Sequence, residues 1–305
     1  MLSAFAEAIA TRSATPPDPA AIAAKWLDPK GRSEIMTHLR DIAVYTKVVD
    51  GPQAIVQQFE RERVVPMYQR VANSIRDVDT RHILFLGTLM ACNMGIRTGI
   101  EPLTLRNGSR DPQQAYAPHG YDIVVDTPDL ANASSDRVQL IFDRHAESGK
   151  RLGMPVLIGE WGAYGGSGTE IVPAAEFNAR LFEKHLFSDT YWDYGQEIAN
   201  ASYLPALVRA APERVSGTLV SYANDPEAGT FICVWNEQPA ILAPTRIYIP
   251  ERVRTNGYTV AVEPPGQPHA EEPLAGDKGA VVLVVPATGQ AMERRMTVTW
   301  QPVGP

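Results

Sequence analysis

A single carboxylate at the end of an apolar run is the first candidate for chemistry in this sequence. Glu160 ends such a run in the segment LIGEWGAYGG (157–166). Because a buried charge is costly, we expect Glu160 to emerge where a strand leaves the core. In a barrel of parallel strands, that end of each strand carries the catalytic groups. The pattern alone also allows a capping or ion-paired carboxylate.

Four aromatic or imidazole side chains could act with this carboxylate on a sugar. His119 and Tyr121 are two apart in the segment YAPHGY (116–121), so on a strand they face the same side. Tyr121 could then hydrogen-bond the carboxylate, and His119 could touch a sugar hydroxyl. Trp192 could form a flat platform for a pyranose ring, and Trp161 is a further substrate-binding candidate. Taken singly, such residues could equally be core histidine, tyrosine and tryptophan, but their combination and order favour a site.

The elements that must position these residues alternate between apolar strands and amphipathic helices up to about residue 200. The expected strands are 82–86, 115–122, 154–160 and 190–194, and the expected helices are 59–77, 135–145 and 174–186. The three-to-four spacing of apolar residues in the first helix indicates one buried face. That face comprises Val64, Met67, Tyr68, Val71, Ala72 and Ile75. Ser135 is expected to cap the second helix.

This rhythm predicts an α/β fold with a partial (β/α)8 barrel, because a closed barrel needs eight strands and only four are found. From about residue 202, short β-rich runs separated by Gly, Pro and Asn predict an antiparallel β-sandwich. The expected domains are a helical segment at 1–58, a half-barrel carrying Glu160 at 59–201, and the sandwich at 202–305. We expect the sandwich to brace the barrel, with ligand binding as the alternative.

Composition narrows the classes of partner. The 305 residues carry a formal net charge of −7, which argues against nucleic acid because phosphate binding needs a basic face. Cys92 and Cys233 leave a disulfide possible without implying one, and no metal or organic cofactor is expected. Neither a transmembrane segment nor a signal peptide is recognisable, so we expect a soluble chain whose localisation is open.

Three motifs together resemble a known enzyme family. HGY (119–121), IGEWG (158–162) and YWDY (191–194) are similar to strands six, seven and eight of glycoside hydrolase family 5. Within that family, the sequence most resembles the endoglycoceramidase and glycolipid β-glucosidase branch. The stretch PMYQRVANSIRDVDTRHILFL (66–86) is similar to the fourth helix and fifth strand of that branch, and the segment from Leu207 resembles the start of its β-sandwich.

The resemblance implies a role for each matching residue. It makes Glu160 the nucleophile and Tyr121 the residue that holds it. It also makes His119 a substrate contact and Trp192 the aromatic platform. The resemblance runs from about Phe59, and residues 1–58 resemble an insertion into the barrel.

The sequence also departs from the family pattern. Four active-site residues that the family has on earlier strands have no match: an Arg, a His, and an Asn-Glu pair whose Glu is the acid/base. The one Asn-Glu here, Asn236-Glu237, lies in the β-rich tail. Gly87 stands where the branch commonly has a Glu after the fifth strand, which puts a support residue in doubt.

The resemblance therefore predicts a retaining β-glycosidase that releases sugar from a glycolipid of glycosylceramide type through a glycosyl-enzyme intermediate. The acid/base would come from outside the chain. We expect the chain to be a fragment of a longer hydrolase. As alternatives, it could be complemented by the missing half-barrel or by a second copy of itself, or it could be a degenerate relative. The alternatives are a β-glucanase or cellulase acting on polysaccharide, and a glycolipid- or carbohydrate-binding pseudoenzyme.

Overall fold

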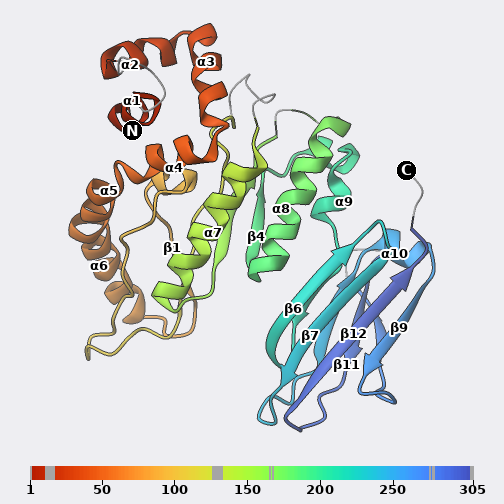
Figure 1. Cartoon of the computed structure of the whole chain (residues 1–305). Coiled ribbons are helices and arrows are strands. Elements are labelled where there is room, and N and C mark those ends of the chain that lie inside the picture. Colours follow the sequence, from red (N-terminus) through yellow and green to blue (C-terminus); the bar gives the residue numbers. More distant parts are fainter. Residues whose placement is uncertain are drawn as a thin grey trace. The chain divides into compact units, whose positions relative to one another are not determined.

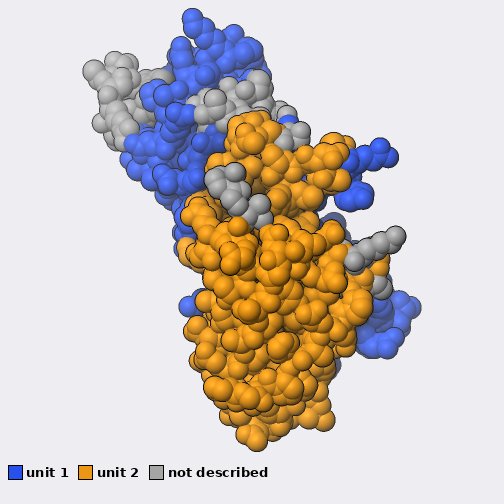
Figure 2. Space-filling view, turned by 90° about the vertical axis from the view of Figure 1, so that its right-hand side faces the viewer, with its two compact units in different colours: residues 1–166, 187–196 blue, residues 167–186, 197–305 orange. Residues whose placement is uncertain are grey.

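The chain forms two compact units, shown in different colours in Figure 2. The computed structural model describes residues 2–10, 18–125, 133–164, 166, 168–274, 276 and 279–302. Unit 1 comprises residues 1–166 and 187–196, and unit 2 comprises residues 167–186 and 197–305. The segment 167–186, which we expected in the half-barrel, thus groups with the β-rich residues.

Unit 1 begins with four helices. They are α1 (Leu2–Ala10), α2 (Pro19–Leu27), α3 (Pro29–Leu39) and α4 (Ile42–Asp50). The side chains of Asp18, Asp28 and Asp41 cap the last three by accepting hydrogen bonds from backbone amides of the first turn. Their apolar faces form one core that also receives Ile96 and Val124. These helices therefore pack onto the segments of unit 1 that contain Ile96 and Val124, rather than standing apart from them.

The next helical stretch is interrupted by a π-helical turn. It consists of α5 (Gln53–Phe59), η1 (Glu60–Val64) and α6 (Val65–Arg76). The expectation of one buried apolar face holds only in part: Ala72 is buried, but Met67 is 43% exposed and Val71 52% exposed, and the remaining three residues are half-buried. The physical reason is that the described residues that pack against this helix cover only part of its apolar face. Glu60, in contrast, is fully buried.

Four short parallel strands follow, in the order expected from the sequence (Figure 1). They are β1 (Leu84–Leu86), β2 (Gln114–Tyr116), β3 (Leu157–Gly162) and β4 (Ser188–Trp192). β1 pairs with β2 and β3 pairs with β4, both in parallel. Single parallel bridges, Tyr116 to Val156 and Gly120 to Trp161, join the chain around β2 to that around β3. The four strands thus run side by side.

Helix α7 (Ser135–Leu152) connects β2 to β3. Its cap is Ser134 rather than the expected Ser135, since the Ser134 hydroxyl accepts a hydrogen bond from the backbone N–H of Arg137. The helix runs seven residues past the expected end at His145, to Leu152, and stops at Gly153, which adopts a left-handed φ of 58°. Ser148, Gly149 and Leu152 are buried in this last part, so one side of it continues the packing face that Ile141 and Phe142 begin. The 3-10 helix η2 (Met90–Met94) lies in the loop between β1 and β2.

Unit 2 contains the expected antiparallel sandwich. One sheet has the order β10-β11-β8-β5 and the other β6-β7-β12-β9, and all pairs are antiparallel. The strands are β5 (Ala211–Arg214), β6 (Gly217–Asp225), β7 (Thr230–Glu237), β8 (Thr245–Ile249), β9 (Tyr258–Glu263), β10 (Ala270–Pro273), β11 (Val281–Val285) and β12 (Met292–Trp300). The helices are η4 (Thr169–Ile171), α8 (Val172–His185), η5 (Gln196–Asn200), α9 (Leu204–Leu207) and α10 (Glu251–Thr255).

Two buried carboxylates hold unit 2 together. Glu183 of α8 accepts hydrogen bonds from the backbone and side chain of Asn224 in β6 and from Arg209. This explains why α8 groups with the sandwich. Glu237 is ion-paired with the fully buried Arg294, and it also accepts hydrogen bonds from Thr288. Glu237, the acid of the one Asn-Glu pair in the sequence, is therefore a structural residue of the sandwich.

His145 of α7 is a buried histidine whose two ring nitrogens are both engaged in unit 1. The Tyr116 hydroxyl donates to Nδ1 at 3.0 Å, and Nε2 donates to the backbone carbonyl of His119 at 3.0 Å. Burial lowers the pKa of His145 to about 4. The fold therefore requires the neutral ring.

This gives a prediction for the pH dependence of stability. The unfolded chain binds a proton at His145 below pH about 6.5 but the folded chain only below about 4, so stability falls between these values by up to roughly 3 kcal/mol. Denaturant unfolding of wild type and of His145→Gln at several pH values measures this. The variant should have a lower free energy of unfolding than wild type at pH 7, but that free energy should decrease less when the pH is lowered. A variant of the exposed His269, His269→Gln, should behave as wild type, and parallel curves for His145→Gln and wild type would refute the account.

Candidate active site

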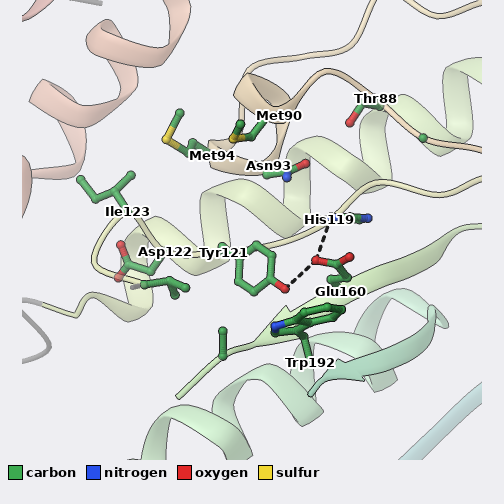
Figure 3. A pocket seen from close by; sticks show the side chains of 13 residues that line it. Thr88, Met90, Asn93, Met94, His119, Tyr121, Asp122, Ile123, Glu160 and Trp192 are labelled. Atoms are coloured by element: carbon green, nitrogen blue, oxygen red, sulfur yellow. Dashed lines mark hydrogen bonds and ion pairs between the residues drawn. The ribbon is translucent and has the colours of Figure 1, made fainter. Parts of the chain in front are cut away.

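The carboxylate of Glu160 lies between two of the expected partners (Figure 3). Its Oε2 accepts a hydrogen bond from the Tyr121 hydroxyl at 3.0 Å and lies 3.3 Å from Nδ1 of His119. The Glu160 side chain is 33% exposed, so the carboxylate keeps contact with solvent. The structure thus brings Glu160 together with two residues that lie far away in the sequence, Tyr121 being 39 positions before it and His119 still further.

Backbone pairing aligns these residues. The chain that continues from β2 runs alongside β3: the Gly159 N–H donates to the Pro118 carbonyl at 2.9 Å, and the Gly120 N–H donates to the Glu160 carbonyl at 3.0 Å. Because side chains alternate along an extended chain, His119 and Tyr121 point to the same side, toward the Glu160 carboxylate. Gly120 between them is required by space, since a Cβ there would lie 2.9 Å from the Phe142 ring.

The two tryptophans have different surroundings. Trp192, at the end of β4, is 51% exposed and lines the same pocket as Glu160. Trp161 is fully buried: its indole N–H donates to Asp189 at 2.9 Å, and its ring packs edge-on against Tyr191. The structure therefore does not bring Trp161 into the pocket as expected. It follows Glu160 directly on a strand, so its side chain points to the opposite face.

The pocket around Glu160 is an open cavity of about 780 Å³. Its lining includes an apolar group that sequence reasoning missed: Met90, Met94, Ile123 and Val125. In Figure 3, the labelled members of this group lie on the other side of Tyr121 from Trp192. The sequence did point to these residues. Met90 and Met94 follow the expected strand 82–86, Ile123 and Val125 follow the expected strand 115–122, and the loops after the strands are where a barrel carries its active site. Gly87 also lines the pocket, at the position where the branch commonly has a Glu.

Buried polar contacts hold the wall formed by η2. The Glu60 carboxylate accepts hydrogen bonds from the N–H of Leu89 and the hydroxyl of Thr98, on either side of this short helix. The Tyr45 hydroxyl of α4 donates to the Met94 carbonyl at 2.7 Å, and the Tyr121 N–H donates to the Asn93 carbonyl. The wall is therefore tied to the N-terminal helices and to Tyr121 itself.

A second carboxylate lines the pocket, but its oxygens are already engaged. Asp122 accepts two hydrogen bonds from the guanidinium of Arg137, at 2.7 and 3.0 Å, and one from the Ser134 N–H at 2.8 Å. Arg137 is fully buried. Of the two carboxylates among the described lining residues, Glu160 is thus the one available to a ligand.

Other chemistries find little support in the residues that the structure describes. These residues include no cluster of three or more His, Cys, Asp or Glu side chains that could hold a metal ion. Cys92 and Cys233 are free, buried thiols, and burial raises the pKa of both, so each is a poor nucleophile. Within the described ranges, no helix is long and apolar enough to span a membrane.

Solved structures with a similar fold include an endo-glycoceramidase and a sterylglucosidase. Endo-glycoceramidase II from Rhodococcus sp., in a complex with ganglioside GM3, superposes with a TM-score of 0.61 at 18% identity, covering 90% of this chain and 69% of that one. Cryptococcus neoformans sterylglucosidase 1 gives 0.55 at 12% identity, covering 80% and 45%. At these identities the likeness concerns the fold. No curated protein matches the chain significantly in sequence.

Family models match both units. Residues 45–198 match the cellulase model of glycosyl hydrolase family 5, and residues 209–299 match the C-terminal domain of the same family. The family implies a TIM barrel followed by a β-sandwich, and these matches confirm the family expected from HGY, IGEWG and YWDY. The chain therefore belongs to glycoside hydrolase family 5 and is a glycosidase by descent.

Proposed function

We propose that this protein is a retaining β-glycoside hydrolase with Glu160 as its nucleophile. The observation that carries the proposal is the hydrogen bond from the Tyr121 hydroxyl to Glu160, with His119 at the same oxygen and Trp192 in the same pocket. A hydrogen bond to a carboxylate holds it in one orientation. A held, solvent-accessible carboxylate beside an aromatic surface suits attack on a sugar.

The proposed reaction has two displacements. The free Glu160 oxygen attacks the anomeric carbon, the bond to the aglycone oxygen breaks, and a glycosyl ester forms on Glu160. Water then hydrolyses the ester with the same overall stereochemistry. Trp192 supports the pyranose ring, and His119 contacts a sugar hydroxyl.

We further propose that the acid/base residue is not one of the described residues that line the pocket around Glu160. A retaining enzyme needs a second carboxyl group about 5–5.5 Å from the nucleophile, to protonate the departing oxygen. Asp122 does not suit this role, because the Arg137 guanidinium and the Ser134 N–H occupy its oxygens. The proton donor would therefore reside on a further polypeptide segment.

An open sheet edge supports this arrangement. Among the described strands, β1 pairs only with β2, and Ile83 and Phe85 are 47% and 57% exposed. An unpaired strand edge next to exposed apolar side chains is a place where further chain can add. We propose a partial barrel of strands β1 to β4 that is completed there by an N-terminal half-barrel, with a second copy of the chain as the alternative.

The proposed substrate is a glycolipid of glycosylceramide type. Support comes from Met90, Met94, Ile123 and Val125, which offer an apolar surface beside the proposed sugar position. The endo-glycoceramidase II and sterylglucosidase structures point the same way by their names. To bind the successive sugar units of a β-glucan, a site would need several aromatic side chains along a groove. Among the described residues that line the pocket, the aromatic ones are Trp192 and Tyr121. A binding protein without turnover is the remaining alternative.

The nucleophile is tested by covalent labelling. An activated 2-deoxy-2-fluoro-β-glucoside with a dinitrophenolate leaving group needs little acid assistance, so it should form a stable ester on Glu160. Intact-mass spectrometry and peptide mapping would locate the label. Glu160→Gln should abolish labelling, and Glu293→Gln, on an exposed residue of β12, should not. Folded wild-type protein that takes up no label would contradict the proposal and leave the binding protein as the better account.

The aglycone is tested by competition with labelling. A glucosyl lipid should protect Glu160 at lower concentration than a cello-oligosaccharide does, because burying each methylene is worth roughly 0.8 kcal/mol. Ile123→Ser should raise the protecting concentration of the lipid several-fold relative to that of free glucose. Leu242→Ser, on an exposed residue of unit 2, is the matched control. Equal protection by lipid and oligosaccharide would favour a polysaccharide hydrolase.

A further inference from the structure

The tetrapeptide His119–Asp122 carries both groups that contact the Glu160 carboxylate, and helix α7 contacts this tetrapeptide from behind. Three side chains of α7 take part, at positions 137, 142 and 145. Phe142 packs against the backbone of Gly120 so closely that no Cβ could fit there. The other two make polar contacts, one at each end of the tetrapeptide.

Arg137 fixes the C-terminal end. Its Nε donates to Asp122 Oδ1 at 2.7 Å and its Nη2 to Oδ2 at 3.0 Å. Its Nη1 donates to the Leu39 carbonyl of α3 at 3.0 Å, and its guanidinium lies 5.8 Å from the centre of the Tyr45 ring. A planar, bidentate pair fixes both the distance and the orientation of the carboxylate.

His145 fixes the N-terminal end. Its Nε2 donates to the His119 carbonyl at 3.0 Å, and its Nδ1 accepts from the Tyr116 hydroxyl at 3.0 Å. The second contact sets the tautomer, because a ring nitrogen that accepts leaves the proton on the other nitrogen. The carbonyl between His119 and Gly120 is thereby held from the side opposite to β3.

We propose that Arg137 and His145 are positioning residues for the nucleophile: they hold the tetrapeptide so that Tyr121 and His119 reach Glu160 Oε2 together. This inference rests on the proposed role of Glu160 and adds a fixed cause for its orientation. Arg137 acts through the side chain of Asp122 and His145 through the backbone carbonyl of His119, and neither Arg137 nor His145 is among the described residues that line the pocket. A shift of the tetrapeptide by about 1 Å would take both contacts beyond hydrogen-bonding distance.

The test separates the chemical step from binding. Labelling by the 2-fluoro glucoside would be followed at several concentrations, which yields the rate constant at saturation and the half-saturating concentration. Arg137→Lys and His145→Leu should lower the rate constant by about 10²-fold, the typical effect of a small misplacement near a reacting group. Their half-saturating concentrations should change by less than about threefold, since the lining is intact. His145→Gln keeps a donor for the His119 carbonyl and should restore most of the rate.

Arg151→Lys is the matched control. Arg151 lies on the same helix and donates to the carbonyls of Thr98 and Ile100, away from the tetrapeptide. Its substitution should leave both labelling parameters as in wild type. Equal losses in Arg151→Lys and Arg137→Lys, or a lost affinity with an unchanged rate constant, would overturn the proposal.

Crystal structures of the same variants decide the question if wild-type protein is not labelled. That outcome would count against the nucleophile, not against the positioning. In Arg137→Lys or His145→Leu, the distance from the Tyr121 hydroxyl to Glu160 should exceed hydrogen-bonding range. A retained contact of 3.0 Å in both variants would overturn the positioning role whatever the activity.

Discussion

The site depends on the register between β3 and the chain that continues from β2. Two backbone hydrogen bonds, from Gly159 to Pro118 and from Gly120 to Glu160, set that register. A slip of one residue would turn every side chain to the opposite face, so that His119 and Tyr121 would point away from the carboxylate. Gly120 makes the pairing possible, because it lets the chain approach the Phe142 ring of α7.

Much of the site could be predicted because it follows from local rules. The two-residue period places His119 and Tyr121 on one side, and an apolar strand that ends in Glu160 directs the carboxylate outward. The same period should have excluded Trp161, which directly follows Glu160 and therefore faces the core.

Other features could not be predicted, because they depend on contacts distant in sequence. The wall formed by η2 is held by Glu60 and Tyr45. The sequence of Met90–Met94 itself does not indicate that these two residues contact it. The exposed face of α6 follows from which neighbours are present, which periodicity does not encode. The grouping of α8 with the sandwich likewise depends on Glu183 meeting Asn224 and Arg209 across a long sequence separation.

We propose that Glu160 is a competent nucleophile and that its acid partner is not among the described residues of the pocket. Rates on a series of aryl β-glucosides, whose phenols differ in pKa, test this most directly. Azide would be added to release the glycosyl-enzyme so that turnover can be followed, and kcat/KM then reports the first displacement. We expect log kcat/KM to fall steeply as the phenol pKa rises, because no acid protonates the departing oxygen. A flat dependence would reveal an acid within the chain, and no turnover of the most activated glucoside would contradict the nucleophile.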